Sequence, residues 1–207
     1  MSSRDTILAR LRTDAPGPID AEASALLITP ERPTVDLDEL EGTFLASLSL
    51  PSIAATHDRI GDIAALPEAV SRYLAGHGLP NAVVLPPEPA LLGCDWSNFT
   101  LHGRAAPNEP AAIAVARCGI AETGSLVFET SPVAPMLPNF LALHHIVLLS
   151  TGAIHPYLED AILPGAQPRA HYWITGVSGT TDIEGTYVRG AHGPRFLHVI
   201  LLDAKTG

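Results

Sequence analysis

Three segments of the sequence combine glycines with hydroxyl, carboxylate or imidazole groups, a composition typical of ligand-binding loops. They are "GIAETGSLVFE" (119–129), "ITGVSGTTDIE" (174–184) and "GAHGPRFLHVILLD" (190–203). Glycine lets backbone N–H groups turn toward a ligand, and Ser and Thr add hydroxyl donors. We therefore expect the three segments to line one site that accepts an anion.

The second segment follows the apolar run "HYWIT" and carries the densest set of donors. Its candidate anion-binding residues are Gly176, Ser178, Gly179, Thr180 and Thr181. If Thr180 or Thr181 caps a helix that begins near Asp182, the positive end of that helix favours a phosphate or carboxylate. The alternative is an ordinary loop in which Asp182 only starts the helix.

The first segment places a carboxylate on a connection between two apolar runs. Glu122 can reach a substrate there as base, nucleophile or hydrogen-bond acceptor. Thr123, Gly124 and Ser125 supply the donors beside it. The alternative is a solvated loop glutamate or a cap partner, and the spacing alone does not separate the two interpretations.

The third segment holds His192 between two glycines, just before the last apolar run. A histidine can change charge near neutral pH or donate to an anion, and Gly193 permits close approach of a ligand. The alternative is a turn histidine without a task. Four other histidines lie in or beside apolar runs and are interpreted first as core or edge residues: His144, His145, His171 and His198. Four more show no spacing typical of a metal site: His57, His77, His102 and His155.

The elements that must position these residues alternate between strands and helices. Apolar runs predict strands in "NAVVLP", "AAIAVARC", "GSLVFET", "HHIVLLS", "AHYWITG" and "RFLHVILLD". Helical spacing predicts helices in "LPEAVSRYLAGHG" and "IHPYLEDAIL", and a short one at the N-terminus. Because the strands are apolar throughout, we expect an α/β fold with a mostly parallel sheet and helices on both faces. Ligands of such sheets bind beyond the carboxyl ends of the strands.

The length of 207 residues fits one domain, and the weakly patterned residues 1–66 are interpreted as an N-terminal extension that packs on a domain of residues 67–207. The net charge of −10 disfavours a nucleic-acid partner, which needs clustered Lys and Arg. No run is long enough to span a membrane, and the N-terminus lacks the apolar stretch of a signal peptide, so we expect a cytoplasmic chain. The Leu- and Ala-rich composition would tolerate a homodimer.

Two cysteines, Cys94 and Cys118, cannot supply the four thiolates of a typical iron–sulfur cluster. They also lack the paired spacing of a zinc site. We interpret them as reduced, partly buried thiols, and we expect this chain to bind neither a metal nor a cofactor of its own.

Three blocks resemble the LUD domain family, most of all its lactate utilization protein C branch. They are "GIAETGSLVF" (119–128), "MLPNFLALHHIVLL" (136–149) and "ITGVSGTTDIEGTYVRGAHGPRFLHVILLD" (174–203), and the likeness covers about residues 80–203. The resemblance implies a Rossmann-like fold of the NagB/RpiA/CoA-transferase type. It also implies a role in oxidising L-lactate to pyruvate with two iron–sulfur partner proteins, so the clusters would reside in those partners.

On this hypothesis the three segments hold a small anionic metabolite, and catalysis is assigned to Glu122, His192 and Asp182. An alternative is a stand-alone transferase or isomerase acting on a CoA ester, a phosphosugar or a folate. In CoA-transferases a glutamate followed two residues later by glycine forms a thioester, and "ETG" at 122–124 is loosely similar. A second alternative is a non-catalytic module that binds a metabolite and gates the docking of partners.

Overall fold

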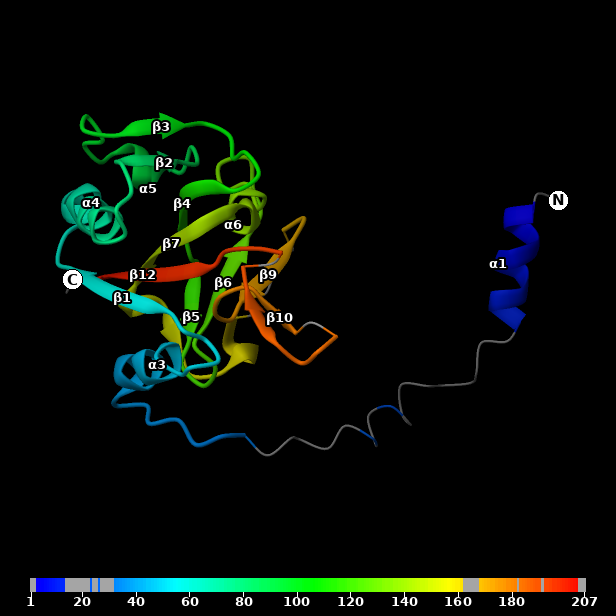
Figure 1. The fold of residues 1–207 in the computed structure, drawn as a ribbon. Helices are drawn as coiled ribbons and strands as arrows, with labels where there is room; N and C mark the ends of the chain where they lie inside the picture. The colour runs from blue at the N-terminus through cyan, green and yellow to red at the C-terminus, as the bar shows by residue number, and fades with distance from the viewer. Residues whose placement is uncertain are drawn as a thin grey trace. The chain divides into compact units, whose positions relative to one another are not determined.

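A computed structural model describes residues 3–13, 23, 26, 32–161, 168–181, 183–190 and 192–204. Residue contacts divide the chain into two compact units, Met1–Thr34 and Val35–Gly207. The first unit contains helix α1 (Ser3–Thr13), at the place where the sequence predicts a short helix. The second unit contains every strand of the described residues (Figure 1).

A six-stranded sheet forms the centre of the second unit, with the strand order β1-β12-β7-β4-β2-β3. Its strands are β1 (Thr56–Ile60), β2 (Ala82–Val84), β3 (Thr100–His102), β4 (Glu109–Val115), β7 (Ala142–Ser150) and β12 (Phe196–Leu202). Every neighbouring pair is parallel. The central strands are mostly apolar on both sides because both faces of the sheet are covered. The predicted α/β class with a parallel sheet is confirmed.

Helix α4 (Leu66–Gly76) covers one face of this sheet together with the short helix α5 (Pro89–Leu92). A proline in its first turn starts α4 where the sequence predicts it, since that position needs no N–H donor. Apolar residues of α4 then recur at helical spacing and meet the sheet. The buried contacts on this face include Leu66, Val70 and Leu74 from α4 with Ile113, Ile146 and Ile200 from the strands.

The opposite face is covered by helix α3 (Leu40–Leu48) and by a second sheet of four strands, in the order β8-β5-β6-β9. These strands are β5 (Cys118–Ile120), β6 (Ser125–Glu129), β8 (Ile154–His155) and β9 (His171–Ile174). Phe44 and Leu48 of α3 pack here against Val147 and Leu149 of β7. Helices therefore lie on both faces as expected, but the second sheet is an addition that the sequence patterns do not predict.

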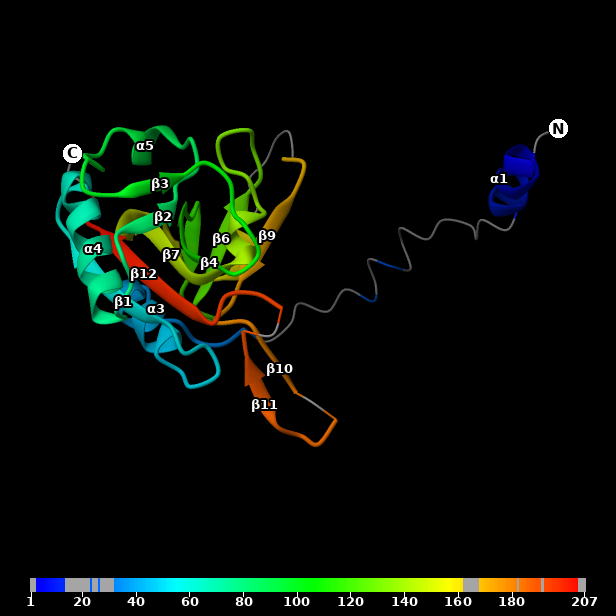
Figure 2. The ribbon, with the colours of Figure 1, turned by 45° about the horizontal axis from the view of Figure 1, so that its top comes forward.

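Two predicted helices are wrong. "IHPYLEDAIL" begins with β8 and continues into a short 3₁₀ helix, Leu158–Ala161, because Pro156 cannot donate to a strand ladder and also interrupts a helix. The helix expected near Asp182 is replaced by a hairpin of β10 (Gly179–Thr181) and β11 (Tyr187–Arg189). Figure 2 shows this hairpin projecting away from both sheets. Asp182 itself lies outside the described residues.

Residues 35–66, which the sequence analysis assigned to the extension, contribute to the second unit. They supply α3, the edge strand β1 and a 3₁₀ turn at Ile63–Ala65. β1 pairs with β12 over its full length. The boundary between the two compact units thus lies between Thr34 and Val35, whereas the predicted boundary follows residue 66.

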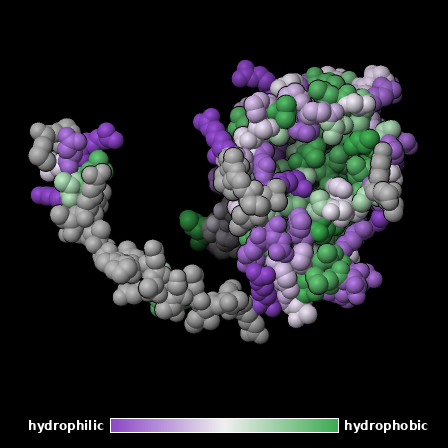
Figure 3. Space-filling model, turned by 180° about the vertical axis from the view of Figure 1, so that it is seen from behind, coloured by the Kyte–Doolittle hydropathy of each residue, from purple (hydrophilic) through white to green (hydrophobic). Residues whose placement is uncertain are grey.

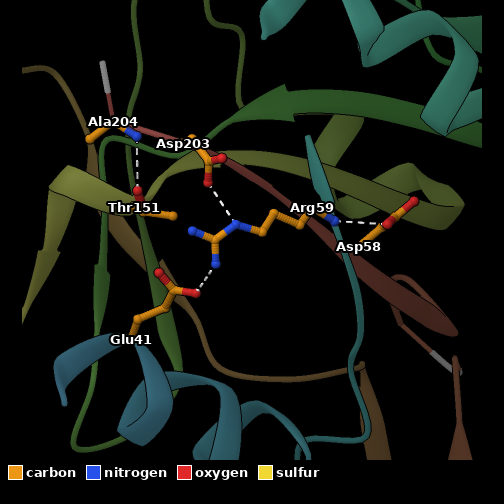
Figure 4. A network of polar contacts seen from close by, with 6 residues as sticks. All are labelled: Glu41, Asp58, Arg59, Thr151, Asp203 and Ala204. Atoms are coloured by element: carbon orange, nitrogen blue, oxygen red, sulfur yellow. Dashed lines mark hydrogen bonds and ion pairs between the residues drawn. The ribbon is translucent and has the colours of Figure 1, made fainter. Parts of the chain in front are cut away.

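Arg59 connects α3 to the carboxyl ends of the sheet (Figure 4). Its Nη1 lies 2.5 Å from Oε1 of Glu41 in α3, and its Nε donates to Oδ1 of Asp203, after β12, at 2.6 Å. The hydrogen bond with Asp203, reinforced by the charge of Glu41, raises the pKa of the guanidinium. The backbone N–H of Ala204 donates to Oγ1 of Thr151, after β7, at 2.9 Å. These contacts join three strand ends to one helix.

Several large apolar side chains of the second unit remain exposed. They include Val133, Met136 and Leu137 on the connection before helix α6 (Pro138–Leu141), Phe140 within it, and Trp173 on β9. Figure 3 shows that hydrophobic side chains form a continuous area on one face of the unit, bordered by hydrophilic ones. None of the helices in the described part of the chain is long and apolar enough to cross a membrane.

Candidate functional site

The "AETGS" segment forms the turn between β5 and β6. The Glu122 carboxylate accepts a hydrogen bond from the backbone N–H of Leu158 at 2.9 Å, so it caps the 3₁₀ helix that begins there. Gly124 has φ +65°, and a side chain at this position would lie about 3.1 Å from the backbone of Ser47 and Leu48 in α3. Glu122 therefore makes a structural contact, and the turn is held against the end of α3.

The hydroxyl groups of this turn form a short chain. Oγ1 of Thr123 lies 2.7 Å from Oγ of Ser125, which in turn lies 2.6 Å from Oγ1 of Thr175. Ser125 is only 4% exposed, so its hydroxyl is satisfied by protein groups rather than by solvent. This is the point at which the first predicted segment meets the second.

The second and third predicted segments are brought together after β9. The backbone N–H of Ser178 donates to the carbonyl of Pro194 at 2.8 Å, and the N–H of Gly190 donates to the carbonyl of Ser178 at 2.8 Å. Gly193 lies so close that an added Cβ would be 3.1 Å from Cβ of Ser178. Ser178 is thus fixed between Gly190 and Pro194 of the third segment.

These residues surround a hollow of about 260 Å³, here named the loop pocket. Its walls are Asn139, Phe140, Trp173, Ile174, Gly176, Ser178, His192, Gly193 and Pro194. A neighbouring hollow of about 240 Å³ shares Phe140, His192 and Gly193 with it. The described walls of both hollows contain no acidic side chain, which suits an anionic guest.

The loop pocket does not lie where the sequence analysis expected it. Pro194 precedes β12 and Phe140 precedes β7, so the pocket opens at the amino ends of the parallel strands. The reason is that β9, the "HYWIT" strand, belongs to the second sheet and runs antiparallel to β6. Its carboxyl end therefore does not share an edge with the carboxyl ends of the main sheet.

Not all predicted residues reach this pocket. Gly176, Ser178, His192 and Gly193 line it, whereas Glu122, Thr123, Gly124 and Ser125 do not. Thr180 and Thr181 lie in β10, paired with β11. Gly179 lies under the ring of Tyr187, since an added Cβ would fall 2.0 Å from the phenol oxygen. Asp182 lies outside the described residues, so the catalytic role predicted for it has no geometry here.

Three of the histidines interpreted as core residues are indeed buried: His144, His145 and His198. Nδ1 of His144 lies 2.9 Å from the Tyr73 hydroxyl, and Nδ1 of His198 lies 2.8 Å from Oγ1 of Thr56. Burial lowers the pKa of each of these two rings to about 4, with a smaller contribution from the charge of His77. Both are therefore neutral at pH 7, and their hydroxyl partners hold them in place.

A second hollow, which the sequence analysis missed, lies where the chain changes direction across the main sheet. From β2 the chain continues to β3 on one side, and from β4 it continues to β7 on the other. β2 pairs with β4 only at Val84 and Ala112, since the prolines that follow β2 cannot donate to a ladder. The strands separate beyond this pair, at their carboxyl ends, which is where open parallel sheets bind ligands.

This hollow, here named the switch-point crevice, has an outer part of about 300 Å³ and a narrow inner part of about 20 Å³. The Arg117 guanidinium forms an ion pair with the Glu129 carboxylate on one wall, and Glu88 stands on the other. The outer part is completed by Val115, Ala116, Ser131, Val133 and Ala134. The proline-rich "PEPALL" (87–92) directly follows a predicted strand, but this local pattern does not indicate that Glu88 shares a crevice with Arg117.

The two cysteines are not arranged as metal ligands. Cys118 is buried, and Cys94 is partly buried with its thiol 3.4 Å from the carbonyl of Ile63. Burial raises the pKa of both thiols, which disfavours the thiolate form that metals bind. Across the residues whose positions are described, no group of three or more His, Cys, Asp or Glu side chains could hold a metal ion.

Part of this chain is similar to known proteins. Residues 109–202, which run from β4 to the end of β12, match the LUD domain. An uncharacterized protein of Neisseria meningitidis serogroup B is 32% identical over 100 residues, which make up 46% of this chain and 43% of that protein. The matched part therefore spans less than half the length of this curated relative.

A crystal structure of a DUF162 family protein from Deinococcus radiodurans has a similar fold. The similarity covers 82% of this chain and 99% of that chain, with a TM-score of 0.55 and 15% sequence identity. At this level of identity the likeness concerns the fold alone. The similarity in fold therefore includes most of the second unit, and not only residues 109–202.

Proposed function

Because residues 109–202 match the LUD domain, we propose that the chain is a subunit of a cytoplasmic system that oxidises L-lactate to pyruvate. The observation that carries the proposal is the match of residues 109–202, which contains both sheets' central strands and the loop pocket. Iron–sulfur clusters held by partner proteins would accept the electrons. Neither cysteine of this chain is placed to hold such a cluster, which supports this division of labour.

We assign the small carboxylate to the loop pocket. Lactate is a compact anion with one apolar methyl group, and the pocket offers the hydroxyl of Ser178 and the imidazole of His192 beside the apolar Phe140 and Trp173. Oxidation of L-lactate to pyruvate releases two protons, one from the hydroxyl group and one from C2, and two electrons. His192 would take the hydroxyl proton, the C2 proton would pass to solvent, and the two electrons would pass singly to the clusters of the partner proteins. The absence of acidic groups from the described walls lowers the cost of binding a negative charge there.

Assembly and turnover together test this proposal. The chain is combined with candidate iron–sulfur proteins from the same organism, and L-lactate-dependent reduction of an electron acceptor is measured. We expect His192→Ala to lower turnover at least tenfold, since loss of a general base typically costs 10² or more. His57→Ala is the control, because His57 is an exposed histidine on β1 that lines neither hollow.

Two results contradict the proposal in different ways. A chain that neither binds the iron–sulfur proteins nor changes their turnover is not a subunit of that system. Full turnover by His192→Ala, with assembly weakened by substitutions in the same pocket, identifies instead a binding module that gates docking.

A further inference from the structure

Glu88 presents a carboxylate that the rest of the structure does not use. It precedes α5 as the cap residue but makes no side-chain capping bond, and within the described part of the chain no ion pair or hydrogen bond satisfies it. Three prolines flank it, at 86, 87 and 89, and each fixes its own backbone φ angle. The carboxylate therefore lines the crevice from a backbone segment with few accessible conformations, which reduces the backbone entropy lost when a ligand binds.

The charge of the switch-point crevice is negative on balance. Its outer part is lined by two carboxylates, Glu88 and Glu129, and by one guanidinium, Arg117. The Arg117–Glu129 ion pair leaves the charge of Glu88 uncompensated. A negative lining attracts a cation and repels a small carboxylate or phosphate.

The remaining surface of the crevice is apolar. Val115, Ala116, Val133 and Ala134 line the outer part, and the narrow inner part reaches the ring of Phe128. The outer volume of about 300 Å³ lies at the lower end of the range for small-molecule sites. This combination suits a ligand with one cationic head and a short apolar stem.

We propose that the switch-point crevice binds a protonated amine or guanidinium carried on a short apolar stem, with Glu88 as its principal ion-pair partner. Such a group belongs to a free amine metabolite or to a Lys or Arg side chain of a partner protein. The proposal is independent of lactate oxidation, since the outer part of the crevice lies at the carboxyl ends of the strands and shares no residue with the loop pocket at their amino ends. Only the narrow inner part reaches Asn139, which also lines the loop pocket.

The test compares three probes that share a phenyl ring and differ in the polar group attached to it: benzylamine, benzoate and benzyl alcohol. Each is titrated into the full chain while backbone amide chemical shifts are recorded. We expect saturable shifts with benzylamine, centred on Glu88, Val115 and Arg117, and weak ones with the other two probes. Equal binding of benzoate, or shifts centred elsewhere, overturns the proposal.

Glu88→Gln and Glu39→Gln form a matched pair of variants. Both glutamates precede helices as cap residues, neither makes a side-chain capping bond, and each change removes one negative charge. Since Glu39 is exposed on α3, its substitution should leave benzylamine binding unchanged. Glu88→Gln should weaken that binding about five- to tenfold, as expected for loss of one partly buried ion pair. Equal affinities of the two variants reject Glu88 as the partner.

A second arm distinguishes the two sources of the cationic group. A capped pentapeptide with lysine between leucines is compared with the same peptide containing norleucine. If the lysine peptide binds the crevice at least tenfold more tightly than benzylamine, a partner's side chain is the source. If benzylamine binds more tightly, the source is a free amine, and if neither probe binds, the proposal is wrong.

Discussion

At the scale of single residues, His145 stands out because its imidazole is completely buried and neither ring nitrogen has a partner among the described residues. Burial lowers its pKa to about 3. His145 is therefore neutral in the folded state, whereas in the unfolded chain its imidazole takes up a proton near pH 6.5. The stability of the folded state that depends on a neutral His145 is fully present above pH 6.5 and is lost as the pH falls toward 3.

We predict that His145→Leu stabilises the second unit at pH 7 by about 1–2 kcal/mol, because it removes an unsatisfied polar group from an apolar core. The loss of stability between pH 6.5 and 4 should also become less steep. It should not disappear, since His144 and His198 have lowered pKa values as well. Urea unfolding at several pH values measures both effects. If His145→Leu is instead less stable, the imidazole of His145 makes a polar contact with a group outside the described residues.

Glu122 permits a second prediction, which separates a structural glutamate from a catalytic one. Its carboxylate accepts the N–H of Leu158, and an amide oxygen can accept the same bond. Glu122→Gln should therefore keep lactate turnover within twofold, while Glu122→Ala should cost about 1 kcal/mol of stability. L-lactate turnover measures the first effect, and unfolding curves measure the second. If Glu122→Gln abolishes lactate turnover in a folded chain, Glu122 is catalytic rather than structural. If acyl-CoA yields an adduct on Glu122 in mass spectra, the transferase alternative is correct.

Some residues of the loop pocket could be predicted from the sequence. Glycine and hydroxyl residues cluster in loops that approach a ligand, and on this basis Ser178, His192 and Gly193 were selected, which do line one pocket. It could not select Glu88 and Arg117, whose meeting in one crevice depends on the separation of two parallel strands. A lone charged residue after a strand carries no such information by itself.

At the scale of elements, the segment from β9 to β10 depends on a glycine with a left-handed backbone. Gly176 has φ +85°, and an added Cβ would lie 2.7 Å from Cα of Ile53. The N–H of Val177 also donates to the carbonyl of Ile53 at 3.1 Å. The loop pocket therefore relies on this close approach of two backbones.

We predict that Gly176→Ala destabilises the second unit by about 3 kcal/mol or more. The positive φ accounts for about 1 kcal/mol of this, and the contact with Ile53 accounts for the rest. Gly185→Ala is the control, because Gly185 has φ +82° but no atom within 4 Å of an added Cβ. Thermal unfolding of both variants measures the difference. Equal losses for the two would mean that the segment moves away from Ile53 without cost.

The elements themselves were predicted unevenly. α4, β2, β4, β7 and β12 were predicted correctly, since apolar runs and a proline at a helix start are local signals. The antiparallel pairing of β6 with β9 was not, because an apolar run does not state its direction or its sheet. "TTDIE" was assigned to a helix start on its capping residues, yet β-branched Thr180 and Thr181 lie in a strand opposite Val188 and Tyr187.

At the scale of the whole molecule, the core of the second unit requires residues that precede β1. Phe44 and Leu48 of α3 are fully buried, and β1 covers one edge of the main sheet. We predict that a chain beginning at Val35 unfolds at the same midpoint temperature as residues 35–207 do within the full chain. A chain beginning at Pro67 should not fold, since it loses both elements. Thermal unfolding followed by circular dichroism measures both midpoints. A cooperative transition of the chain that begins at Pro67 would contradict the prediction.

The proposed role in L-lactate oxidation can be tested by growth of a deletion strain on L-lactate as sole carbon source, in a background without another lactate dehydrogenase. We expect that deletion abolishes growth, that the wild-type chain and Glu122→Gln restore it, and that His192→Ala does not. Normal growth of the deletion strain in that background would exclude this role.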